Sequence, residues 1–215
     1  MSWRIFDKKY VDYDRWFEEK GKNIYISELE AIKEIKPNFN RDSIEIGVGT
    51  GRFASPLNIK YGLEPSIKMA KKSLRRSIKV IIGVAEELPF KKESFDSALM
   101  IVTVCFLDNL EKSFSEINRI LRKNGELIIG FVPSESSWGK FYLKKKREGH
   151  PYYKYAKFYT FDEIKHITEK NGFYIEVVVS TLLSPPHTFK ETENPLNKHS
   201  QKAGFIIIKA KKSKF

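Results

Sequence analysis

A glycine-rich turn directly after a short apolar run constrains the fold of this 215-residue chain more than any other feature. Residues 44–53 read IEIGVGTGRF, in which three glycines stand at alternate positions: Gly47, Gly49 and Gly51. Glu45 precedes the first glycine by two residues, and Glu64 follows a second apolar run at residues 59–63. Glycines at a strand-to-helix turn let a ligand lie against bare backbone, and an acid at the end of the next strand can bind both ribose hydroxyls. The pattern predicts a parallel α/β sheet that binds a nucleoside.

The spacing of the glycines distinguishes between kinds of nucleoside ligand. The fingerprint of dinucleotide-binding proteins is G-x-G-x-x-G, whose turn holds a pyrophosphate at a helix N-terminus. Here the third glycine comes one position earlier, and Arg52 stands where that fingerprint needs glycine. A glycine turn by itself also occurs without any ligand, so other motifs have to decide. The E-x-G-x-G-x-G pattern resembles motif I of the class I S-adenosylmethionine-dependent methyltransferases, whose ligand carries no phosphate.

Four further segments resemble the same family and follow one another in the family's order. They are residues 64–70 (EPSIKMA), 83–90 (GVAEELPF), 94–96 (SFD) and 120–127 (ILRKNGEL). With the glycine turn they extend the resemblance over about residues 40–180. It is closest to the small-molecule methyltransferases of the ubiquinone/menaquinone-biosynthesis group (methyltransferase type 11). Val84 departs from the pattern, because the family often has Asp there, so the backbone of Ala85 becomes the expected contact to adenine.

The resemblance implies a methyltransferase whose cofactor is S-adenosyl-L-methionine. By the same resemblance, Glu45 orients the turn or the methionine amino group, Glu64 holds the ribose, and the strand end at residues 101–103 lies under the methionine. The expected cofactor-binding residues are Glu45, Gly47, Gly49, Thr50, Gly51, Glu64, Pro65, Ala85, Glu86, Val102 and Thr103. Displacement of a methyl group from a sulfonium depends mainly on alignment and desolvation, so no residue is assigned as catalytic.

Apolar runs and helical patterns alternate along the chain, which predicts a Rossmann-like, doubly wound α/β sheet of seven strands with helices on both faces. The sheet is expected to be mostly parallel, with an antiparallel last strand. The expected strands are residues 43–46, 59–63, 80–83, 98–104, 126–132, 173–179 and 203–210. The expected helices are residues 7–20, 27–36, 51–57, 66–76, 110–121 and 160–171, the second opening on a capping box at Ser27. We expect a single domain, 1–215, with an N-terminal helical lid at 1–40 and an aromatic insertion at 133–160.

Two aromatic segments are candidates for the acceptor side of the site. Tyr10, Tyr13 and Trp16 share one face of the first helix and could either cover the sulfonium cation or only pack on the sheet. The insertion carries eight aromatic side chains, more than a solvent-exposed loop needs, although part of this set is expected in the core. We predict that the two segments meet above the methyl group and that the first is mobile without ligand. The expected acceptor is a small apolar or aromatic molecule.

The histidines and the single cysteine offer few candidates for acid–base or metal chemistry. His187 and His199, in the long segment between the last two strands, could each serve as a base, whereas His166 lies inside a predicted helix and is expected to be structural. Cys105 is interpreted as a small packed residue. One cysteine excludes a multi-cysteine metal site, and no metal is expected.

The chain carries a formal net charge of +12, with basic runs at residues 68–79 and 144–147. Such a balance is typical of a nucleic-acid partner, but also of a Lys- and Glu-rich solvated surface. We expect the helix of the first run to face the sheet with Ile67, Ala70 and Leu74, which turns its lysines outward and favours the solvated surface. An RNA (tRNA or rRNA) methyltransferase and a non-catalytic S-adenosylmethionine-binding protein stay open as alternatives, and nucleic acid is not the favoured partner.

The apolar runs of this sequence are short. None approaches the roughly 20 residues that cross a bilayer, and the first residues do not resemble a signal peptide. The sequence therefore predicts a cytoplasmic protein without a membrane span.

Overall fold

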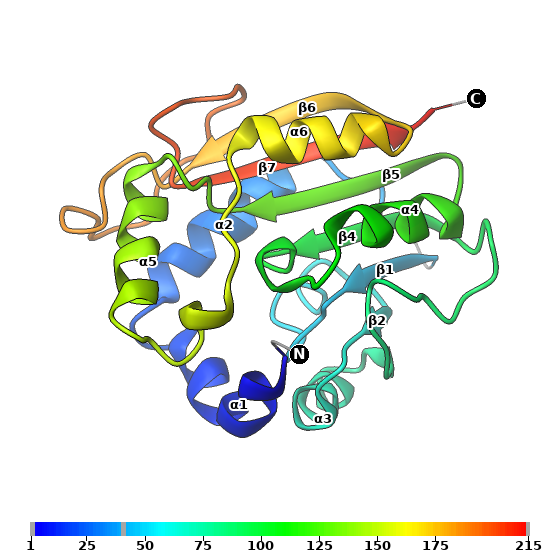
Figure 1. Ribbon diagram of the computed structural model, residues 1–215, viewed down its shortest axis with the longest axis horizontal. Helices are drawn as coiled ribbons and strands as arrows, with labels where there is room; N and C mark the ends of the chain where they lie inside the picture. Colours follow the sequence, from blue (N-terminus) through cyan, green and yellow to red (C-terminus); the bar gives the residue numbers. More distant parts are fainter. Residues whose placement is uncertain (1–2, 40–41, 214–215) are drawn as a thin grey trace.

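The computed structural model describes residues 3–39 and 42–213 and contains the expected seven-stranded sheet. Its strands are β1 (Ser43–Ile46), β2 (Tyr61–Leu63), β3 (Lys79–Ile81), β4 (Phe95–Ile101), β5 (Leu121–Phe131), β6 (Phe173–Thr181) and β7 (Phe205–Lys212). The order across the sheet is β3-β2-β1-β4-β5-β7-β6, and β7 runs antiparallel to both of its neighbours, whereas the other strand pairs are parallel. The predicted Rossmann-like fold is confirmed (Figure 1).

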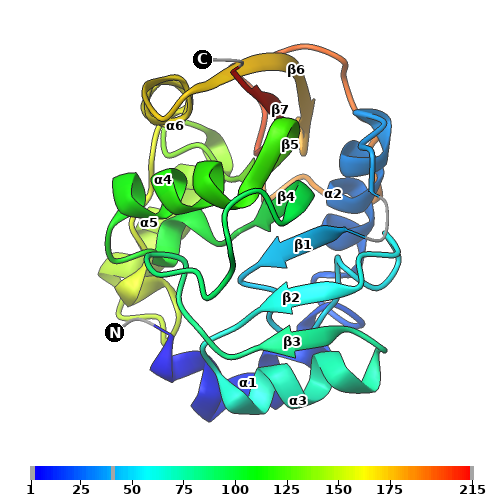
Figure 2. The ribbon, with the colours of Figure 1, turned by 90° about the vertical axis from the view of Figure 1, so that its right-hand side faces the viewer.

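Helices cover both faces of this sheet. They are α1 (Arg4–Trp16), α2 (Lys22–Glu34), α3 (Ile67–Arg75), α4 (Leu110–Ile120), α5 (Ser137–Arg147) and α6 (Phe161–Lys170). Figure 2 shows α4 and α6 on one side of the sheet and α2 on the other, with α1 and α3 side by side below β3. Successive strand residues point to opposite faces, so Met100 of β4 packs in the α4 and α6 core and Leu99 in the α2 core. None of the helices in the described part of the chain has the length and apolar character that a membrane crossing requires.

The α3 helix lies against the glycine turn. Ser66 caps it, since its Oγ accepts a hydrogen bond from the backbone amide three residues later. The expectation that Ile67 and Leu74 face the sheet is wrong, because both are 56% exposed. The buried face is formed by Met69, Ala70 and Ser73. Ser73 Oγ donates a hydrogen bond of 2.8 Å to the carbonyl of Gly49, so close approach to the turn, rather than apolar surface alone, decides which face is buried.

Two predicted helices differ in the structure. The α2 helix begins before the predicted capping box, and Ser27 Oγ donates a hydrogen bond to Asn23 O inside the helix instead of capping it. The predicted helix 51–57 is a series of turns, in which the amides of Ser55 and Leu57 make separate bonds to carbonyls four residues earlier. Pro56, between them, has no backbone N–H to donate, so the ladder of hydrogen bonds is interrupted and no regular helix forms.

Candidate active site

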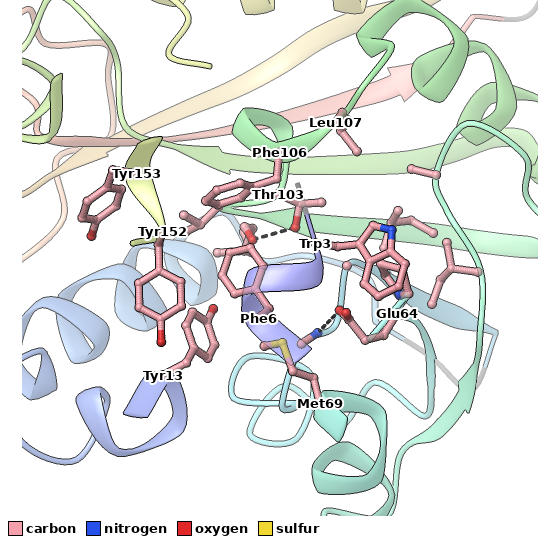
Figure 3. A pocket seen from close by; sticks show the side chains of 18 of the residues that line it. Trp3, Phe6, Tyr13, Glu64, Met69, Thr103, Phe106, Leu107, Tyr152 and Tyr153 are labelled. Carbon is pink, nitrogen blue, oxygen red and sulfur yellow. Dashed lines mark hydrogen bonds between the residues drawn. The ribbon is translucent and has the colours of Figure 1, made fainter. Parts of the chain in front are cut away.

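A cavity of about 450 Å³ opens at the carboxyl ends of β1, β2 and β4, where open parallel sheets bind ligands. The last residue of each of these strands lines it: Ile46, Leu63 and Ile101. Figure 3 shows the side chains around it, which come from α1, from the glycine turn, from the start of α3 and from the segments after β4 and α5. Segments far apart in the sequence thus share one enclosed space.

Most of the expected cofactor-binding residues lie in the wall of this cavity. The expected residues that line it are Gly47, Gly49, Glu64, Pro65, Ala85, Glu86, Val102 and Thr103. Glu45, Thr50 and Gly51 lie behind the wall. Gly51 faces α3 and Ile78, since a Cβ atom there would come within 2.5 Å of Ile78 Cδ1. The structure therefore separates the expected set into residues that can touch a ligand and residues that support the turn.

The glycine turn begins directly after the last residue of β1, and hydrogen bonds to β2 hold it in place. The amides of Gly47 and Val48 both donate to the carbonyl of Leu63, at 2.8 and 3.0 Å. Gly47 has φ of +72°, and a Cβ atom there would come within 2.6 Å of the Thr103 side chain. Gly49 has φ of +55°. Both residues therefore combine a left-handed backbone with close approach to a neighbour or the cavity, and this combination requires glycine.

Glu64 ties the glycine turn to the start of α3 from inside the cavity. One carboxylate oxygen accepts a hydrogen bond from the Gly49 amide at 2.9 Å (Figure 3), and the other accepts one from the Ser66 amide at 2.8 Å. Burial raises the pKa of Glu64 to about 7, although these two amides oppose the shift. Each carboxylate oxygen can accept a further hydrogen bond. The arrangement fits a ligand that brings two hydroxyl donors.

Glu45 supports the turn from behind. Its side chain is only 2% exposed, and burial raises its pKa well above the ordinary value despite a hydrogen bond from the Ala54 amide. Its Oε2 has no hydrogen-bond partner within residues 3–39 and 42–213. The sequence left two roles open for Glu45: to orient the turn or to bind the methionine amino group. In the structure its side chain contacts the loop after the turn and is not exposed to the cavity.

A strained residue ends β4 under the glycine turn. The strand stops at Ile101, not at residue 104 as predicted, because Val102 has φ of +52°. A β-branched residue pays strain of about 1–3 kcal/mol for this conformation. Thr103 Oγ1 then donates to Ile101 O at 3.0 Å, which turns its side chain toward Gly47.

Burial raises the pKa of the nearby Cys105 to about 12, so its thiol stays protonated and fits the expected packing role.

Apolar side chains, among them Leu63, Val84 and Leu107, line the cavity together with Ala85. Ala85 lines it and is buried, while Val84, which replaces the family's Asp, is partly exposed. Glu86 also lines the cavity, but its carboxylate accepts hydrogen bonds from the amides of Asp108 and Asn109, at 2.8 and 3.2 Å. Glu86 therefore joins two loops around the cavity.

Several wall residues were not found by sequence reasoning. They include Trp3, Phe6, Met69, Phe106 and Leu107. Trp3 lies beside Glu64 in Figure 3, and its buried Nε1 has no acceptor among the residues that the structure describes. Phe6 was missed because α1 begins earlier than the predicted residue 7; its spacing of seven to Tyr13 is the signal that could have found it. Tyr10, one of the candidates for covering the sulfonium, lies outside the cavity, with its ring centroid 5.9 Å from the ammonium of Lys68.

The two aromatic segments contact each other across the cavity. The rings of Phe6 and Tyr152 stack with centroids 5.3 Å apart, and the Tyr152 hydroxyl donates to Lys9 O at 2.9 Å. Only Tyr152 and Tyr153 of the eight aromatic residues counted after β5 line the large cavity. Trp138 and Tyr142 of α5 are core residues. That α1 moves in the absence of ligand stays a prediction.

An ionic cluster holds α1 over the glycine turn. Asp14 accepts from Arg52 Nε at 2.8 Å and from Arg76 at 3.1 Å, and Lys72 Nζ lies 3.3 Å from its other oxygen. Burial alone would raise the pKa of Asp14, but the arginine hydrogen bonds hold it well below its ordinary range. The expectation that the lysines of this helix point outward is therefore wrong for Lys72, and Arg76 of the same basic run also contacts Asp14.

The candidate bases of the long loop lie elsewhere. His187 and His199 are outside the cavity wall, and the ring of His199 stacks on Phe161 with centroids 4.0 Å apart. His150, which sequence reasoning left without a role, lines the cavity, and burial and the charge of Lys145 lower its pKa.

Comparison with known proteins gives consistent similarities. A methyltransferase domain family matches residues 44–129. A crystal structure from Thermotoga maritima, described as an S-adenosylmethionine-dependent methyltransferase and possible histamine N-methyltransferase, is 41% identical with a TM-score of 0.92, and the match covers 99% of this chain and 100% of that one. An uncharacterised protein of Methanocaldococcus jannaschii is 38% identical, over 97% of this chain and 98% of its own length. The ubiquinone/menaquinone biosynthesis C-methyltransferase UbiE of Rickettsia massiliae is 29% identical, over 64% of this chain and 58% of that protein.

Proposed function

We propose that this chain, which belongs to the class I S-adenosylmethionine-dependent methyltransferases, transfers the methyl group to a small-molecule acceptor inside the 450 Å³ cavity. The observation that carries the proposal is that one cavity runs from Glu64 and Ala85 to Tyr152 and Tyr153. Cavities of about 300–1,000 Å³ are typical of small-molecule sites. This one is large enough for the cofactor together with a small acceptor.

The residues of the wall fit the cofactor of this family. Gly49 leaves the turn without a side chain facing Tyr13 and Met69, and the Glu64 carboxylate is in place for two ribose hydroxyls. Apolar walls at Ala85 suit the adenine ring, whose nitrogen atoms could also satisfy the unpartnered indole N–H of Trp3. S-adenosylmethionine supplies a methyl group on positively charged sulfur. We assign the cofactor contacts to Gly47, Gly49, Glu64, Pro65, Ala85, Glu86, Val102 and Thr103.

The chain's own contribution to the reaction is alignment and the exclusion of water. Phe6 and Tyr13 of α1 and the ring of Tyr152 enclose the middle of the cavity (Figure 3). Aromatic faces stabilise a cation such as a sulfonium. A desolvated acceptor held in line with the breaking S–C bond needs no covalent help from the protein.

The first prediction concerns the cofactor. S-adenosylhomocysteine is expected to raise the melting temperature of the protein, because a ligand that binds only the folded state stabilises it. NAD is expected to leave it unchanged, since the turn lacks the third glycine spacing of dinucleotide sites. Thermal-shift measurements at equal ligand concentrations check this. A shift with NAD and none with S-adenosylhomocysteine would contradict the proposal.

The second prediction concerns the RNA alternative. Part of the basic charge is taken up by Asp14, which contacts Arg52, Lys72 and Arg76, and α1 covers the cavity. We expect a fluorescence titration with tRNA to show only weak binding that disappears between roughly 50 and 200 mM salt. Tight binding that survives the higher salt concentration would favour an RNA methyltransferase instead.

A further inference from the structure

One of the carboxyl groups that line the cavity, that of Glu28, has no part in the cofactor turn. Glu28, in α2, is 5% exposed and lines the same cavity as Glu64. Within residues 3–39 and 42–213, its side chain makes no hydrogen bond or ion pair, and burial alone raises its pKa to about 8. Burial of an unpaired carboxyl group costs folding free energy. That cost is expected where a ligand supplies the missing partner.

The surroundings of Glu28 are aromatic. Tyr13, Trp16 and Phe17 line the cavity from the side of α1, and Tyr152 and Tyr153 line it from the segment after α5. In Figure 3, Tyr13, Tyr152 and Tyr153 lie on one side of Phe6, while Glu64 and Trp3 lie on the other. Burial raises the pKa of the phenols of Tyr13, Tyr142 and Tyr153, and the carboxylate of Glu28 adds to each shift, so Glu28 lies near these tyrosines.

The combination of one carboxylate and several ring faces selects a cation. Carboxylates form strong charge-assisted hydrogen bonds with ammonium groups, and aromatic faces attract the same charge. Lys145 also lines the cavity, but its ammonium lies over the Phe141 ring, 4.6 Å from the centroid, and does not affect the pKa of Glu28. Resting on the proposed function, we propose that Glu28 binds the positively charged amino group of the acceptor, so that the acceptors are small amines with an apolar or aromatic body.

Binding of an amine is expected to change the protonation of Glu28. With a pKa of about 8, most of Glu28 is protonated at pH 7 in the absence of acceptor. Binding of an ammonium group requires the carboxylate, so Glu28 loses its proton to the buffer. Burial raises the pKa of four tyrosine neighbours, and burial and the charge of Lys145 lower that of the cavity histidine, so these groups are neutral at pH 7: Tyr13, Tyr25, Tyr142, Tyr153 and His150. The charged side chains of Asp12, Lys20 and Lys145 also line the cavity, and Glu64 has a pKa of about 7. Saturation with S-adenosylhomocysteine engages Glu64, so we expect the proton released on amine binding to come from Glu28.

Calorimetry on the protein saturated with S-adenosylhomocysteine tests the inference. The probes are 2-phenylethylamine, tyramine and butylamine, each paired with the alcohol of the same shape: 2-phenylethanol, tyrosol and 1-butanol. We expect at least one amine to bind about tenfold or more tightly than its alcohol. At pH 7, comparison of phosphate and Tris buffers should show release of about one proton per bound amine.

Variants separate Glu28 from the rest of α2. Glu28→Gln keeps the size of the side chain and is expected to lose both the preference for the amine and the proton release. Glu30→Gln is the matched control, because Glu30 is exposed on the same helix and pairs with Lys33. It should behave as the wild type.

The outcomes distinguish the inference from the proposed function. Failure of S-adenosylhomocysteine to bind would contradict the proposed function itself. If the cofactor product binds but no amine exceeds its alcohol, or if Glu28→Gln keeps the preference, the amine inference is wrong and the proposed function stands. The wild-type comparison of amine with alcohol needs no variant, so the test does not depend on how Glu28→Gln folds.

Discussion

Replacement of Glu64 by alanine is expected to weaken the binding of S-adenosylhomocysteine by at least about tenfold. In the proposed role the carboxylate accepts hydrogen bonds from both ribose hydroxyls, and hydrogen bonds to a charged group contribute about 1.5–3 kcal/mol each. The variant also frees the amides of Gly49 and Ser66, which Glu64 now binds, so the turn itself becomes less ordered. Calorimetric titration measures the loss. Glu87→Ala, at an exposed acid near the same cavity, is the control.

The same carboxylate gives the binding a pH dependence. Because burial raises the pKa of Glu64 to about 7, only a small fraction is ionised at pH 6 and most is ionised at pH 8. Affinity for S-adenosylhomocysteine should therefore rise by about tenfold between these pH values in the wild type, and stay nearly constant in Glu64→Gln. The stability of the protein without ligand depends on pH in the opposite direction. The free energy of unfolding that protonated Glu64 contributes is fully present below pH 4.5 and is lost as pH rises through about 7. A wild-type affinity that is flat from pH 6 to 8, or unchanged in Glu64→Ala, would remove Glu64 from the cofactor site.

Replacement of Asp14 by alanine is expected to lower the free energy of unfolding by about 2 kcal/mol. The variant leaves Arg52, Lys72 and Arg76 without their shared carboxylate. The loss is smaller than for a fully buried ion pair, because these three side chains keep 14–28% of their exposure. The contribution of Asp14 is present above its ordinary pKa of 3.8 and is lost as pH falls toward the lowered value of the folded state.

The same variant bears on the N-terminal helix. Without Asp14, α1 loses its ionic link to the glycine turn and to α3, so its amides should exchange hydrogen faster and S-adenosylhomocysteine should bind less tightly. Urea denaturation and hydrogen exchange of residues 4–16 measure these effects. Glu19→Ala removes only an exposed contact to Arg15 at 3.9 Å and should change stability by less than about 0.5 kcal/mol. Equal stability and equal exchange in Asp14→Ala and the wild type would show that the cluster does not hold α1.

Local patterns were sufficient for the fold and for the residues that line the cavity at its glycine-turn end. The alternation of apolar runs and helices predicted the sheet, because each strand and its crossover helix carry their own periodicity and connection length. The glycine turn and Glu64 could be predicted because their chemistry depends on a spacing of few residues around one strand end. Helix faces were harder: the pattern assigned Ile67 and Leu74 to the core, but contact with Gly49 rather than apolarity decides how α3 is rotated.

The sequence by itself determined a class I methyltransferase-like sheet with a glycine turn and its acid. Only the tertiary structure showed that Asp14 links three basic side chains from two other segments, that Trp3 lies beside Glu64, and that Glu28 lies in the cavity. In the sequence, Glu28 is the second residue of the predicted capping box. Its burial could not be predicted, because a buried acid and a surface acid have the same local pattern. Burial and charge neighbours arise from segments more than a hundred residues apart, such as α2 and Tyr153, and no local spacing records them.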